Sequence, residues 1–105
     1  MAEVCEAAEG AALLFLVSPN NPTGAIITRD EFTEVVTRLP ETLILHDQAY
    51  REFSEPEFDL TDTALAHPNV VLVRTFSKAW GGAGLRAGYA VGDRRVIDWL
   101  RRIGQ

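Results

Sequence analysis

The sequence of 105 residues has little cysteine, no long apolar run and no cluster of basic residues. Cys5 is the single cysteine, so an internal disulfide is impossible and a cytoplasmic, reducing compartment is expected. The longest apolar run, residues 11–17, is too short for a membrane-spanning helix, and the N-terminus lacks the layout of a secretory signal. We therefore expect a soluble protein with no membrane partner.

The charge balance is acidic, with a formal net charge of −5. Binding to nucleic acid or to an anionic membrane surface requires a concentrated cationic face, which this sequence does not offer. A small-molecule ligand is the expectation that remains. The length is sufficient for one domain with one core.

Four short apolar stretches have the length of β-strands: residues 13–17, 42–46, 70–74 and 87–91. The first three show no polar alternation, which is typical of strands buried on both faces of a mostly parallel sheet. The sequence therefore predicts an α/β fold in which helices cover both faces of the sheet.

Helices are predicted between these strands. Thr28 begins a capping box, because its hydroxyl can accept from the Glu31 amide while Glu31 reaches back. The helix that follows carries an apolar stripe and stops at Pro40. A shorter helix, capped by Thr61 or Asp62, would join the second and third strands. Apolar residues at helical spacing also predict a helix at each end of the chain.

Polar residues follow directly after each of the three buried strands, at residues 20–24, 47–50 and 75–78. In an open α/β sheet, ligands bind at the carboxyl ends of parallel strands. We therefore expect these three segments to converge on one crevice.

The residue types in these segments match the needs of a pyridoxal-type cofactor. A partly desolvated Lys78 near a cation such as Arg86 favours the free amine, a nucleophile toward an aldehyde. Asp47 can hold a proton on a pyridine nitrogen, which makes the ring an electron sink. Tyr50 and Asn21 can share the oxygen of the ring hydroxyl.

A phosphate group requires hydroxyls, backbone donors and a cation. Thr75 and Ser77 lie just before the lysine, and the glycine-rich residues 81–84 allow close approach of the backbone. Arg86 offers a planar fork that matches phosphate oxygens.

Each of these residues also has an ordinary structural alternative. Asp47 can cap a turn, Asn21 can serve only its own turn, and Thr75 can be satisfied by local backbone groups. His46 and His67 have no partner at ligand spacing, so no metal site is predicted.

Three motifs in the same order resemble those of the class I and II aminotransferases, which are fold-type I pyridoxal-phosphate enzymes. Residues 18–24 resemble the family's Asn-Pro-Thr-Gly turn, and residues 47–50 are similar to its Asp-x-Ala-Tyr motif. Residues 75–78, with Arg86 eight residues after Lys78, resemble its lysine segment. This last motif is most similar to the histidinol-phosphate aminotransferase subgroup.

The resemblance implies a site built around pyridoxal 5'-phosphate, held by Lys78 as a Schiff base. Its catalytic residues would be Lys78, Asp47 and Tyr50, and its further cofactor contacts Asn21, Thr75, Ser77 and Arg86. The implied reaction transfers an amino group from an amino acid to a 2-oxo acid, and Lys78 moves a proton at the substrate Cα.

Members of this family are several times longer and act as homodimers, so the resemblance covers only the central part of their large domain. We therefore expect residues 1–105 to form a partial cofactor-binding large domain that is inactive alone. Two alternatives stay open: an enzyme similar to the threonine-phosphate decarboxylases, which keeps the cofactor and breaks another bond, and an inactive piece that complements another chain.

Overall fold

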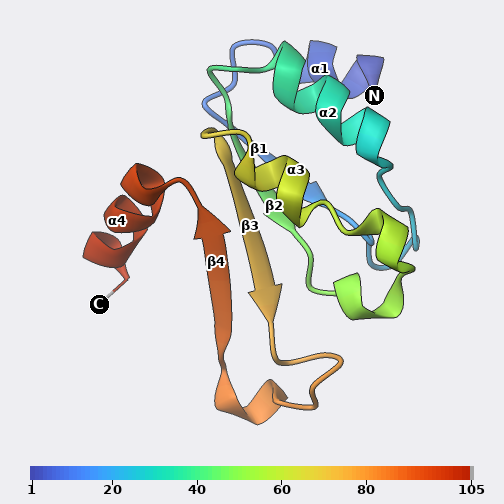
Figure 1. The fold of residues 1–105 in the computed structure, drawn as a ribbon, viewed down its shortest axis with the longest axis vertical. Coiled ribbons are helices and arrows are strands. Elements are labelled where there is room, and N and C mark those ends of the chain that lie inside the picture. The colour runs from blue at the N-terminus through green and yellow to red at the C-terminus, as the bar shows by residue number, and fades with distance from the viewer. Residues whose placement is uncertain (105) are drawn as a thin grey trace.

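The computed structural model describes residues 1–104, which form a four-stranded sheet in the order β1-β2-β3-β4 (Figure 1). Strands β1 (Leu13–Val17), β2 (Leu43–Asp47) and β3 (Val70–Thr75) are parallel to one another. Strand β4 (Gly88–Gly92) pairs antiparallel with β3. The predicted, mostly parallel α/β sheet is confirmed, and each strand end lies within a single residue of its predicted position.

Helices lie on both sides of this sheet. Figure 1 shows α1, α2 and α3 on one side of the strands and α4 on the other side, next to β4. The helices are α1 (Ala2–Ala7), α2 (Arg29–Arg38), α3 (Thr61–Leu65) and α4 (Arg94–Ile103), with short 3-10 turns η1 (Arg51–Phe53), η2 (Pro56–Phe58) and η3 (Ala83–Leu85). Within residues 1–104, no helix has the length and hydrophobicity needed to cross a bilayer.

The capping box that was predicted before α2 is present. The Thr28 hydroxyl accepts from the Glu31 amide at 3.3 Å, and the Glu31 carboxylate accepts from the Thr28 amide at 2.9 Å. The Thr28 amide and the Thr28 hydroxyl both donate to the Glu31 carboxylate, and these two hydrogen bonds hold the pKa of Glu31 below its ordinary value. The helix ends at Arg38, just ahead of the proline at position 40 that cannot continue it.

The caps predicted for α3 are wrong. Leu60 is the N-cap residue, and both Thr61 and Asp62 lie inside the helix. The start of the helix is instead stabilised by Asp59, whose carboxylate accepts from the Thr61 amide at 3.0 Å. An aspartate side chain readily accepts a hydrogen bond from the backbone amide two residues later, which forms a local turn. Here this turn takes the place of a cap by Thr61 or Asp62.

The hydrophobic core lies between the sheet and the helices α1, α2 and α3. Alternate strand residues point into it, since side chains along a strand face opposite sides of the sheet. Its fully buried or nearly buried members include Leu16, Ile44, Val70 and Leu72 from the strands and Phe32, Val35 and Val36 from α2.

The opposite face of the sheet is only partly covered within this chain. Leu13 and Phe15 of β1 are 54% and 55% exposed, whereas Val71 of β3 is 2% exposed. The continuous apolar runs predicted burial on both faces. The difference arises because α4, which follows β4, is the only described helix on this side, and β1 lies at the far edge of the sheet.

One core position of β2 is occupied by a histidine. The His46 side chain is completely buried, and its ring centroid lies 4.8 Å from that of Phe32. Neither ring nitrogen has a hydrogen-bond partner among the described residues. Burial, together with the positive charge of Arg74, lowers the pKa of His46 to about 4.

This buried histidine predicts an acid-sensitive fold. Between pH 6.5, its ordinary pKa, and about pH 4, His46 binds a proton only in the unfolded chain, so the free energy of unfolding falls as the pH falls. The loss through this window should be on the order of 3 kcal/mol. Urea unfolding of the wild type and of His46→Leu measures the effect, since the variant lacks the titrating group. Parallel pH profiles for the two proteins would contradict the prediction.

Candidate active site

The carboxyl ends of the three parallel strands meet at one edge of the sheet. Val17, Asp47 and Val73 are register partners across β1, β2 and β3. The segments that follow these strands therefore begin side by side, as their order in the sequence predicted. Backbone hydrogen bonds extend the pairing beyond the strands, because the Ser18 amide donates to the Asp47 carbonyl at 3.0 Å.

Asn21 and Tyr50 come from different segments and are in direct contact. The Asn21 Nδ2 donates to the Tyr50 Oη at 3.0 Å, although the two residues are 29 positions apart. The loop that carries Asn21 is held at its base by Ser18, a buried residue whose hydroxyl accepts from the Ile27 amide at 2.8 Å. An amide and a phenol are thus directed at one point beside the sheet edge.

The turn itself is stabilised by the preceding residue, Asn20. Its carbonyl accepts from the Gly24 amide at 2.7 Å, and its side-chain oxygen accepts from the Thr23 hydroxyl at 2.7 Å. Gly24 has φ of +72°, a conformation that favours glycine. The turn-forming role that was an alternative for Asn21 therefore belongs to Asn20, and the Asn21 side chain reaches Tyr50.

Lys78 lies beside the same phenol. Its Nζ is 5.2 Å from the centroid of the Tyr50 ring, within the range of a cation–π contact. The sequence predicted a partly desolvated lysine. In this chain the Lys78 side chain is instead exposed. The reason is that the segment between β3 and β4 extends beyond the end of the sheet (Figure 1).

Asp47 and Thr75 line a cavity of about 270 Å³ on the partly covered face of the sheet. The Asp47 Oδ1 accepts from the Ala49 amide at 2.8 Å, which fixes the carboxylate against its own turn. The Thr75 Oγ1 accepts from the Ser77 amide at 3.1 Å and donates to the Ala87 carbonyl at 3.4 Å. The local roles considered for both residues are thus present, and both side chains also face the cavity.

Arg86 lies apart from this group. Its guanidinium donates to the Ala83 carbonyl at 3.2 Å, and its side chain is exposed. Its φ of 51° makes it the only non-glycine residue with positive φ among residues 1–104. The structure therefore brings Asn21, Tyr50 and Lys78 together and does not bring the Arg86 side chain to them.

Four residues that border the site were not identified from the sequence. They are Arg74, Gln48, Asp59 and Arg51. Arg74, the residue before Thr75, donates hydrogen bonds to Gln48 and Asp59, and Asp59 also forms an ion pair with Arg51. A charged residue inside the otherwise apolar strand β3 was the one available signal, because a buried arginine requires a partner.

Comparison with known proteins identifies the family. The profile of the family described as aminotransferase class I and II matches residues 1–105. A histidinol-phosphate aminotransferase from Symbiobacterium thermophilum is 50% identical over 92 residues, which cover 87% of this chain and 26% of that protein.

Solved structures show the same arrangement. The histidinol-phosphate aminotransferase from Sinorhizobium meliloti, in complex with pyridoxal-5'-phosphate, superposes with a TM-score of 0.85 at 32% identity, covering 97% of this chain and 28% of that one. The L-threonine-O-3-phosphate decarboxylase from Porphyromonas gingivalis superposes with a TM-score of 0.78 at 31% identity, covering 92% and 29% of the two chains.

The chain spans about a quarter of the length of the curated relatives that it matches. The family motifs predicted at residues 18–24, 47–50 and 75–86 all fall inside the matched region. Since the family profile matches the chain along its whole length, this chain belongs to the class I and II aminotransferases.

Proposed function

We propose that this chain forms part of the cofactor-binding large domain of a homodimeric, pyridoxal-phosphate-dependent aminotransferase. The complete protein would transfer an amino group from an amino acid of the histidinol-phosphate type to a 2-oxo acid. The observation that carries this proposal is the contact of Asn21 with Tyr50 at 3.0 Å, with the Lys78 amine 5.2 Å from the same phenol ring. The substrate class is supported by the names of the similar enzymes.

The residues present fit this cofactor. Pyridoxal phosphate, when bound, supplies a ring that withdraws electrons from the substrate Cα. An aldehyde needs an amine, and Lys78 is the only lysine in the chain. A pyridine nitrogen needs a carboxylate, and Asp47 lines the cavity at the end of β2. A phenolic oxygen needs hydrogen-bond donors, and Asn21 with Tyr50 offers them from two separate loops.

Each residue then has a definite task. Lys78 would hold the cofactor through its amine, and the same amine is suited to take a proton from the substrate Cα. Asp47 would accept a hydrogen bond from the protonated pyridine nitrogen of the cofactor. Because Asn21 donates to the Tyr50 oxygen, the phenol proton is free to be donated to the ring oxygen.

Thr75, Ser77 and Arg86 are proposed for the phosphate. Thr75 is the last residue of β3, and Ser77 lies in the bend that follows it, directly before Lys78. Arg86 directly follows η3, and its guanidinium would exchange the Ala83 carbonyl for phosphate oxygens.

A decarboxylase is the second candidate. It is favoured by the similarity to the Porphyromonas gingivalis decarboxylase, which covers nearly the same part of this chain. Both reactions use the same cofactor contacts, so release of carbon dioxide rather than of a 2-oxo acid distinguishes them. A third candidate, an inactive piece that complements another chain, is favoured by the open face at Leu13 and Phe15.

Replacing Lys78 should abolish covalent retention of the cofactor. Wild-type protein treated with pyridoxal phosphate and borohydride should gain one cofactor mass on the peptide that contains Lys78, and Lys78→Ala and Lys78→Arg should gain none there. Because residues 1–105 contain no other lysine, a cofactor mass on the peptide that contains Lys78 is assigned to that side chain. Cofactor fixed at another position of the wild type would overturn the assignment.

Asp47→Asn should separate binding from chemistry. The amide oxygen can still accept from the Ala49 amide, so the turn is retained, but a neutral amide cannot hold the proton on the pyridine nitrogen. Exchange of the substrate Cα proton should slow by about 10² to 10⁴-fold while the cofactor still binds. Deuterium exchange followed by NMR measures this step, and a near-normal rate would exclude Asp47 from the role.

Arg86 offers a comparison between two small replacements. Both Arg86→Ala and Arg86→Gly should weaken cofactor binding, since each removes the guanidinium. Only glycine adopts the left-handed backbone without steric cost, which is about 1 kcal/mol or more for other residues. Arg86→Gly should therefore be at least as stable as Arg86→Ala, although glycine loses more entropy on folding. Thermal unfolding gives the order, and a clearly less stable glycine variant would contradict it.

A further inference from the structure

A cluster of polar side chains lies behind the candidate site, on the face of the sheet that α3 covers. Its centre is Arg74, whose side chain is 17% exposed. Arg74 donates through Nε and Nη2 to the Gln48 Oε1, at 3.0 and 2.9 Å. The same Nη2 lies 2.8 Å from the Thr61 Oγ1 and 3.3 Å from the Asp59 Oδ1.

Asp59 connects this arginine to a second one. Its Oδ2 pairs with Arg51 at 3.2 Å, and the Arg51 side chain is only 14% exposed. Burial acts to raise the pKa of Asp59, but the hydrogen bonds from Thr61 and the charges of Arg51 and Arg74 outweigh it, so the pKa is lowered. One carboxylate therefore joins two largely buried cations.

The cluster is attached to the same backbone that carries the proposed catalytic residues. Gln48 follows Asp47 directly, is 1% exposed, and points to the face opposite the cavity. Its amide donates to the Val73 carbonyl at 2.9 Å, and its carbonyl accepts from the Arg51 amide at 3.1 Å. The segment from Asp47 to Arg51, with Tyr50 inside it, is thus held at both of its ends.

We propose that Asp59, acting through Arg74 and Arg51, is a positioning residue that fixes Asp47 and Tyr50 relative to Thr75 and Lys78. The Asp59 carboxylate contacts Arg74 and Arg51 but has no hydrogen bond or ion pair with Asp47 or Tyr50 among residues 1–104, so it acts through the two arginines. Its effect on the reaction rests on the proposed function, whereas its effect on the order of segment 47–51 does not.

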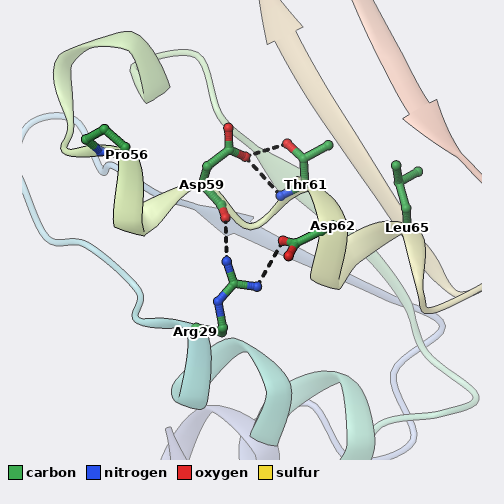
Figure 2. Close-up of a pocket in the computed structure, with 6 residues that line it drawn as sticks. All are labelled: Arg29, Pro56, Asp59, Thr61, Asp62 and Leu65. Carbon is green, nitrogen blue, oxygen red and sulfur yellow. Dashed lines mark hydrogen bonds and ion pairs between the residues drawn. The ribbon is translucent and has the colours of Figure 1, made fainter.

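A neighbouring ion pair provides a matched control. Arg29 of α2 pairs with Asp62 of α3 at 2.9 Å and also donates to the Asp59 carbonyl, as Figure 2 shows. The Arg29 and Asp62 side chains are 45% and 76% exposed, and neither contacts segment 47–51 through any hydrogen bond among residues 1–104. Asp62→Asn therefore removes a carboxylate three residues from Asp59 that itself has no hydrogen bond or ion pair with Arg74, Arg51 or Gln48 among residues 1–104.

The test compares Asp59→Asn with Asp62→Asn in the full polypeptide. An amide oxygen can accept from one arginine, but the amide NH₂ would then face the other, so Asp59→Asn should release one anchor. Hydrogen exchange of the cofactor-free protein should become faster in segment 47–51 for Asp59→Asn and not for Asp62→Asn. With cofactor and substrate, kcat should fall about 10 to 100-fold for Asp59→Asn only.

A second pair of variants guards against simple loss of folding. Gln48→Glu retains an acceptor for Arg74 and should keep wild-type exchange, whereas Gln48→Leu removes it and should show the same local acceleration as Asp59→Asn. Equal exchange in segment 47–51 for Asp59→Asn and Asp62→Asn, or for the two Gln48 variants, would overturn the inference. If the wild type fails to fix pyridoxal phosphate on Lys78, the proposed function is wrong, and the exchange data still decide the positioning role.

Discussion

The parallel pairing of β2 with a strand on each side is the constraint on which the rest of this structure depends. It fixes where three chain segments leave the sheet, and it fixes the direction of every side chain at that edge. Along the end of β2, His46 enters the core, Asp47 enters the cavity on the opposite face, and Gln48 returns to the covered face. A shift of β2 by one residue would exchange these environments.

This alternation divides the two kinds of polar group between the two faces. The groups suited to cofactor chemistry lie at the strand ends or on the partly covered face, where a small molecule can reach them. The groups that restrain the backbone lie on the covered face, where water is largely excluded and hydrogen bonds to charged groups are strong. A single loop, from Asp47 to Arg51, takes part in both.

Much of the fold and the convergence of the motifs could be predicted from the sequence, because both depend on local rules. Apolar runs gave the strands, the Thr28 capping box gave the start of α2, and the strand-end rule placed Asn21 beside Tyr50. The Arg74 cluster could not be predicted, since Gln48 and Asp59 lie 26 and 15 residues away in the sequence. The exposure of Lys78 depends on the path of a glycine-containing loop, which hydrophobic periodicity does not encode.

The single lysine has a consequence for chemical selectivity. An aldehyde condenses with any accessible primary amine. On most proteins, surface lysines therefore compete with the active-site lysine for the aldehyde. Here the other cationic side chains are all arginines, whose guanidinium groups stay protonated and do not act as nucleophiles. Within residues 1–105, a reactive carbonyl compound therefore meets one side-chain amine, that of Lys78.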